Sequence, residues 1–162
     1  MLFRSLLLRL HRIQAARAQF ERFEADIQDQ GEAALSERIQ CHSRLVKIAE
    51  AVEDDYAEHL HRGIGLYLIA LERIVLPEPE GELSTEELLC KAAGELSLAR
   101  LVRPEEARPC WYLYEVWSHL SQRQPALCRL HQASAAAPFS FLTTAEQRNL
   151  LHACQREEKS RD

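Results

Sequence analysis

The richest concentration of side chains that could do chemistry lies between residues 50 and 61. It contains seven carboxylate and imidazole groups: Glu50, Glu53, Asp54, Asp55, Glu58, His59 and His61. Glu58 and His61 have the E-x-x-H spacing that metal-binding helical bundles use. A helix turns about 100° per residue, which places Glu50, Asp54, Glu58 and His61 opposite the apolar side of this stretch. Since bundle metal sites project inward, we interpret the cluster as a solvated acidic face and expect no metal ligands there.

His59 differs from this cluster because it lies at the edge of the apolar stripe, one turn after Asp55. A buried histidine that is hydrogen-bonded to a carboxylate can respond to pH. More often, such a residue is a satisfied polar group that fixes the register of packed helices. We therefore predict a buried polar pair of His59 and Asp55, with a structural role favoured over a switch.

The five cysteines are widely spaced, without a C-x-x-C motif: Cys41, Cys90, Cys110, Cys128 and Cys154. This pattern argues against a disulfide scaffold and predicts reduced thiols in a cytoplasmic compartment. Cys128 and His131 could share one helix face, but His152 and Cys154 are two residues apart and point in different directions. A four-ligand zinc site is therefore not expected.

Motifs for catalysis are missing from the sequence. It has no G-x-S-x-G, no glycine-rich phosphate loop and no H-E-x-x-H, so we expect no catalytic residue and no cofactor. Four aromatic residues gather within seven positions: Trp111, Tyr112, Tyr114 and Trp117. No basic residue interleaves them, which disfavours single-strand nucleic-acid binding. We predict that they pack in the core, with a partner-binding groove as the alternative.

Charge is distributed unevenly along the chain of 162 residues. The net charge is −5, but residues 1–23 carry five arginines against one glutamate, which leaves −9 for the remainder. An acidic body argues against nucleic-acid binding, except through the basic N-terminal segment. The composition is that of a globular domain, and the few glycines and prolines disfavour a sandwich or barrel.

The spacing of apolar residues predicts an all-α fold. Residues 2–30 form a first helix, whose second apolar line fails where Arg17 and Glu24 occur, and Gly31 follows it. A second helix is predicted from about Glu32 to Val75. Its stripe advances in steps of three and four through His42, Leu45, Ala49, Val52, Tyr56, His59, Gly63, Leu66 and Ala70.

The C-terminal half is predicted to hold about four shorter helices. Two capping boxes, Ser84 with Glu87 and Thr143 with Glu146, mark helix starts. Phe139 and Phe141 are predicted to anchor a loop over residues 134–142. The domain prediction is a long antiparallel helical hairpin at 1–76, a Pro/Glu/Gly hinge at 77–83 and a helical bundle at 84–158, packed as one unit.

Surplus apolar helix surface suggests a function in protein interaction. The segment over residues 64–75 is apolar on all sides, so either the C-terminal helices or another chain must cover it. Residues 1–13 form a basic amphipath that packs in the hairpin, docks on a partner or, less favoured, touches a membrane. The predicted partner-binding residues are Leu2, Phe3, Leu6, Leu10, Ile64, Leu68, Ile69, Leu71, Trp111 and Tyr114.

We therefore expect a non-enzymatic interaction or assembly factor, such as an adaptor, small subunit or chaperone-like protein, with a protein partner or a homo-oligomer. One alternative is a metal- or small-molecule-binding bundle. Another is a nucleic-acid-associated factor that uses the basic N-terminal helix.

Overall fold

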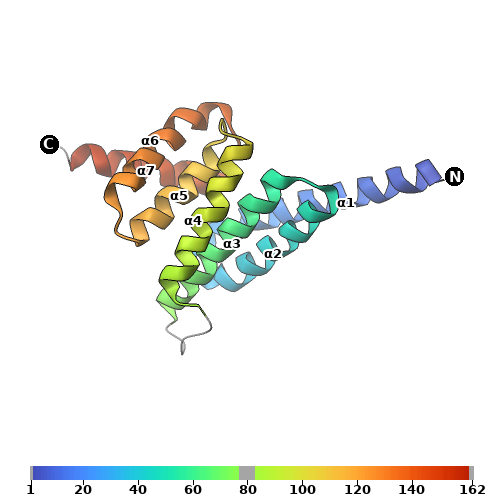
Figure 1. The fold of residues 1–162 in the computed structure, drawn as a ribbon, viewed down its shortest axis with the longest axis horizontal. Helices are drawn as coiled ribbons and strands as arrows, with labels where there is room; N and C mark the ends of the chain where they lie inside the picture. Colours follow the sequence, from blue (N-terminus) through green and yellow to red (C-terminus); the bar gives the residue numbers. More distant parts are fainter. Residues whose placement is uncertain (1, 77–82, 161–162) are drawn as a thin grey trace.

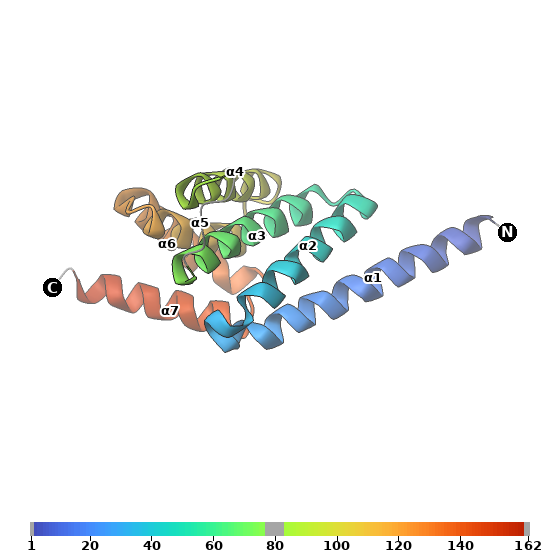
Figure 2. The same cartoon turned by 90° about the horizontal axis from the view of Figure 1, so that it is seen from below.

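A computed structural model of the chain describes residues 2–76 and 83–160, and Figures 1 and 2 show it from two directions. Within these ranges the chain forms seven α-helices and two short 3-10 helices without a strand, which confirms the predicted all-α class. The elements are α1 (Leu2–Ile27), η1 (Gln28–Ala34), α2 (Leu35–Val52), α3 (Asp55–Val75), α4 (Thr85–Val102), α5 (Ala107–His119), α6 (Arg123–Ala136), η2 (Ala137–Phe139) and α7 (Thr144–Lys159).

The connection η1 reverses the chain, so that α2 runs back along the second half of α1 (Figure 2). Gly31 within η1 has φ 63° and ψ −136°, a backbone conformation that is strained for residues with a side chain. The predicted stop at Gly31 therefore matches a real turn, although α1 itself ends four residues earlier, at Ile27.

The predicted single helix from Glu32 to Val75 is wrong. Glu53 adopts the left-handed conformation, with φ 56° and ψ 41°, and Asp54 caps the N-terminus of α3 by accepting a hydrogen bond from Ala57 N at 3.0 Å. The chain turns at this point, and α2 and α3 pack against each other (Figure 2). The apolar stripe continues in phase across the break, so periodicity alone could not reveal it.

The close packing of α3 on α4 depends on one glycine. A Cβ atom at Gly63 would lie 2.7 Å from Leu96 Cγ, closer than two carbon atoms can approach. Gly63 therefore permits a short distance between these helices.

Helix α4 matches its prediction closely. Ser84 accepts from Glu87 N at 3.2 Å, and the Glu87 carboxylate accepts from Ser84 N at 2.7 Å. The residues predicted to face inward are all buried: Leu88, Leu89, Ala92, Leu96 and Ala99. They help to cover the last part of α3, where Ile64 and Leu68 are fully buried. Other helices of this chain thus cover most of residues 64–75. The prediction that Ile64 and Leu68 bind a partner is wrong, because both side chains are fully buried.

Two other expectations change in the C-terminal half. Helix α6 extends to Ala136 and continues into η2, and the predicted anchors Phe139 and Phe141 are 90% and 67% exposed. Leu142 and Thr143 are buried in their place. The predicted hinge at 77–83 lies almost entirely outside the described residues. Among the described residues, no helix is both long enough and apolar enough to cross a lipid bilayer.

Candidate functional site: a buried polar network beside a groove

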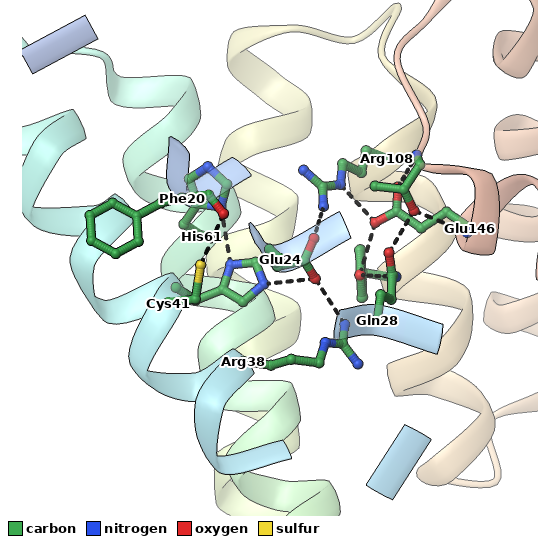
Figure 3. A network of polar contacts seen from close by, with 11 residues as sticks. Phe20, Glu24, Gln28, Arg38, Cys41, His61, Arg108 and Glu146 are labelled. Carbon is green, nitrogen blue, oxygen red and sulfur yellow. Dashed lines mark hydrogen bonds and ion pairs between the residues drawn. The ribbon is translucent and has the colours of Figure 1, made fainter. Parts of the chain in front are cut away.

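The centre of the network is the carboxylate of Glu24, which is 1% exposed on the inner face of α1. It accepts hydrogen bonds from Arg38 Nη2 at 3.1 Å and from Arg108 Nη2 at 3.2 Å, and His42 Nε2 lies 3.4 Å away (Figure 3). A buried charge without partners would be strongly destabilising, so these two guanidinium groups allow Glu24 to occupy the core.

A second buried carboxylate, Glu146 at the start of α7, extends the network to the C-terminal helices. It accepts from Arg108 Nε at 2.8 Å and from the Tyr112 hydroxyl at 2.9 Å (Figure 3). Glu146 is also the acid of the predicted capping box, in which its other oxygen accepts from Thr143 N at 2.9 Å. The Glu146 carboxylate therefore caps α7 and also pairs with Arg108 of α5.

Gln28 binds two partners of Glu146 through its side-chain amide. Gln28 Nε2 donates to the Tyr112 hydroxyl at 3.3 Å, and the Thr143 hydroxyl donates to Gln28 Oε1 at 2.5 Å. The network consequently ties residues near the end of α1 to α2, α5 and α7.

A histidine pair lies behind Glu24. His42 and His61 are both buried, and their Nδ1 atoms are 3.1 Å apart, so one ring must donate and the other accept. If His42 donates from Nε2 to Glu24, its Nδ1 accepts from His61 Nδ1–H, and both rings are neutral. Burial lowers the pKa of His42, despite the opposing effect of Glu24, and lowers the pKa of His61 well below its ordinary value.

The ionic groups at the centre stay charged. Burial by itself would raise the pKa of Glu24, but the hydrogen bond of His42 and the charges of Arg108 and Arg38 hold it well below its ordinary value. Burial opposes the charged form of Arg108, yet the Glu146 and Glu24 carboxylates raise its pKa. Two carboxylates thus face two guanidinium groups, and this core is electrically balanced.

A groove of about 670 Å³ lies beside the network. Arg38, Tyr112 and Gln28 belong to both, so the network forms part of the groove wall. The remaining lining residues come from η1, α2, α3, α5 and α7: Gly31, Leu35, Tyr67, Leu71, Val75, Trp111, Glu115, Asn149, His152, Gln155, Arg156 and Lys159.

The groove contains a further acid, the partly buried Glu115. The Tyr67 hydroxyl donates to Glu115 Oε2 at 3.1 Å. Burial raises the pKa of Glu115, and the bond from Tyr67 and the charge of Arg156 offset this only in part. Acids with a perturbed pKa in a concave site are common at functional sites, so this groove is the candidate functional site of the chain.

The polar pair predicted from the sequence does not form. His59 is partly buried and lies 2.7 Å from Glu95 of α4, whereas Asp55 is exposed. His61 was predicted on the solvated face but is buried against His42, because α2 and α3 are separate helices that pack against each other at these residues. The prediction for His59 and Asp55 as a buried switch is therefore wrong.

Other predicted site residues have different outcomes. Trp111 and Tyr114 are buried, which fits core packing and not a free partner surface, although Trp111 also lines the groove. Ile69 and Leu71 are partly buried, and Leu10 is 42% exposed. The side chains of Leu2, Phe3 and Leu6 lie outside the described part of the structure. In the described ranges, no three His, Cys, Asp or Glu side chains gather closely enough to hold a metal ion.

The thiol nearest to the network is not activated. Cys41 donates from Sγ to the Phe20 carbonyl at 3.2 Å (Figure 3). Burial, helped by the charge of Glu24, raises the pKa of Cys41 to about 11. A thiol in this state is a poor nucleophile at neutral pH.

Sequence reasoning missed Glu24, Arg38 and Arg108 and found Glu146 only as a cap. The available signal was the failure of the apolar line on α1 at Arg17 and Glu24. Both positions prove to be inward-facing: Arg17 Nη1 contacts Asp54 Oδ2 at 2.8 Å, and Glu24 is the network centre. Charged residues that interrupt an apolar stripe indicate that polar partners lie in the core, but they do not identify those partners.

Comparisons with protein-family models, with curated proteins and with solved structures find no match for this chain.

Proposed function

We propose that this chain is a non-enzymatic assembly protein that self-associates through the first half of α1. The observation that carries the proposal is the projection of α1 beyond the rest of the molecule (Figure 2). Arg17 contacts Asp54 at the turn between α2 and α3, so the residues before Arg17 extend past the end of α2. About fifteen helical residues correspond to roughly 22 Å of projecting helix.

The projecting segment carries an apolar stripe, of which Leu10 is 42% exposed. On the packed half of α1, Phe20, Glu24 and Ile27 face the body. The same face continues through Ile13 to the exposed Leu10, and the sequence extends it by sevens to Leu6 and Phe3. A lone helix of this length is marginal in water, and it becomes stable when its apolar side packs against another surface.

Charge complementarity favours a second copy of the chain as the surface on which the projecting half of α1 packs. The first twenty residues contain arginines and no acid, whereas the rest of the chain carries an excess of carboxylates. Glu50, Glu53, Asp55 and Glu58 gather at the turn between α2 and α3. In a reciprocal exchange, the α1 helix of each copy would lie on this acidic corner of the other copy, an isologous twofold arrangement.

Apolar surface is present at the same corner. The last turns of α4 expose Leu98, Leu101 and Val102, and the next residue, Arg103, lies 3.6 Å from Asp54 Oδ1. A basic, apolar helix therefore has both a charged and an apolar surface to contact on a second copy.

The mass of the protein in solution, measured by light scattering across a concentration series, tests this proposal. We expect the wild-type chain to dimerise and Leu10→Asp to remain monomeric with unchanged circular dichroism. The matched control is Leu151→Asp on α7, which introduces the same charge at another exposed leucine and should leave the dimer intact. A wild-type monomer at high micromolar concentration would overturn the proposal. Flotation of that monomer with anionic vesicles would identify a membrane surface as the occupant instead.

The nucleic-acid alternative depends only on the arginines of α1, and a salt-sensitive gel shift that is lost on deletion of residues 2–16 would be needed to support it.

A further inference from the structure

The groove beside the network has the dimensions of a small-molecule site. Its volume of about 670 Å³ falls within the range of roughly 300–1,000 Å³ that is typical of ligand pockets. It lies among η1, α2, α3, α5 and α7, and none of its lining residues belongs to the projecting half of α1. Any ligand that binds there is independent of self-association.

The apolar and the polar side chains of the groove lining come from different helices. Aromatic and aliphatic side chains come from α2, α3 and α5: Leu35, Tyr67, Leu71, Val75, Trp111 and Tyr112. Helix α7 contributes polar and basic side chains: Asn149, His152, Gln155, Arg156 and Lys159. Such a lining suits a ligand with an apolar body and one polar end.

The charges of the lining favour an anion. Arg156 and Lys159 outnumber the one carboxylate of the lining, Glu115, whereas the charge of Arg38 is balanced by Glu24 in the network. The groove is therefore a locally basic site in an acidic protein.

Arg38 also retains hydrogen-bonding capacity. It donates through Nη2 to Glu24, and its buried Nε has no hydrogen-bond partner among the described residues. Buried donors are normally paired, so the protein itself leaves the guanidinium of this groove-lining residue incompletely satisfied.

We propose that this groove binds a small amphipathic carboxylate, with its apolar body against Tyr67, Leu71 and Trp111 and its carboxylate among Arg38, Arg156 and Lys159. The ligand class follows from the volume, the divided lining and the surplus of cations. The site is concave and partly open, so a ligand can enter from solvent over α7.

Decanoate, held below its micelle concentration, is a suitable probe, and Trp111 fluorescence in a Trp117→Phe background reports on the groove itself. We expect saturable one-to-one binding of decanoate, weaker binding of the uncharged decanol and no binding of decyltrimethylammonium. Calorimetry on the wild-type chain provides the stoichiometry. Equal affinity for all three probes would overturn the proposal, because it would show apolar partitioning without an anion site.

Three variants locate the site and its charge. Arg156→Gln, at an exposed position, should weaken decanoate binding about tenfold. Asn149→Tyr should obstruct the groove and abolish binding, whereas Glu115→Gln should strengthen binding about fivefold at neutral pH by removing a negative charge. Lys47→Gln, at an exposed position of α2 outside the groove, is the control for a general loss of positive charge. Unchanged affinity in both Arg156→Gln and Asn149→Tyr would overturn the assignment.

Discussion

Glu24 is buried and Glu115 is partly buried, and the surroundings of the two glutamates differ in partners and in the direction of the pKa shift. Glu24 has two arginine partners and a histidine, and its pKa is lowered. Glu115 has one tyrosine hydroxyl, faces a groove, and its pKa is raised. The first carboxylate holds helices together, whereas the second has few polar partners and lines the groove. Burial alone thus does not distinguish a structural acid from a binding-site acid, but the completeness of its partners does.

Removing the arginine that bridges the two network carboxylates should have the largest effect. Arg108→Met leaves Glu24 and Glu146 buried with too little positive charge, and we expect a loss of about 3–5 kcal/mol in the free energy of unfolding. Denaturant titration followed by circular dichroism measures this loss. Arg123→Met, at a position whose side chain is 69% exposed, should change stability by less than about 0.5 kcal/mol. A similar small change in both variants would mean that the network is dispensable.

Acidification should destabilise the fold through the histidine pair. The pKa values of His42 and His61 are lowered in the folded state, so below the ordinary histidine pKa the unfolded chain binds more protons than the folded chain. Stability is therefore fully present above that pH and falls as the pH decreases, by about 1.4 kcal/mol per pH unit for each ring that stays neutral. Unfolding curves measured between pH 7.5 and 5 test this slope. In His61→Phe one titrating ring is removed, so the slope of stability against pH should decrease by about 1.4 kcal/mol per pH unit. An unchanged slope would contradict this explanation.

The two capping boxes provide a matched comparison of smaller effects. Ser84→Ala removes a cap at the surface and should cost about 1 kcal/mol, the typical value for an N-cap. Thr143→Ala removes an equivalent cap and also the hydrogen bond to Gln28 inside the network, so we expect about 2 kcal/mol. Thermal and denaturant unfolding of both variants measures the difference. Equal losses would show that the link from Thr143 to Gln28 adds no stability.

The smallest effect is expected at Glu115, and its sign should be opposite to that at Glu24. A carboxyl whose pKa is raised on folding destabilises the folded state above its ordinary pKa. Glu115→Gln should therefore increase the free energy of unfolding at pH 7 by up to about 1 kcal/mol, while Glu24→Gln decreases it. The two substitutions can be compared in one denaturation series at pH 7 and repeated at pH 4, where the gain from Glu115→Gln should decrease. A loss of stability in both would remove the distinction drawn between these acids.

Local signals in the sequence predicted the fold class, both capping boxes and the buried face of α4, because each depends on neighbours within one or two turns. The break at Glu53 and Asp54 was missed because a stripe with helical spacing passes through it without a change of phase. Asp54 is a good N-cap residue, but several acids surround it, and nothing local distinguishes it.

The candidate site was harder to predict, since its contacts join distant parts of the chain. Glu24 and Arg108 are 84 residues apart, and Tyr67 and Glu115 are 48 residues apart. Spacing rules describe one helix at a time, so they cannot pair a charge on α1 with one on α5. The aromatic residues near Trp111 were correctly expected in the core, but the groove that they border is formed by five separate elements.

The separation between Glu24 and Arg108 also bears on how the molecule opens. Helix α1 is near the beginning of the chain, yet its buried charge is neutralised by a residue on the far side of the proline-rich segment. If α1 separated from α5, Glu24 and Arg108 would each lose a charged partner. Local opening of α1 is therefore energetically linked to local opening of α5. We expect amide hydrogen exchange in the second half of α1 and in α5 to proceed through the same cooperative unit, and the first half of α1 to exchange independently and faster.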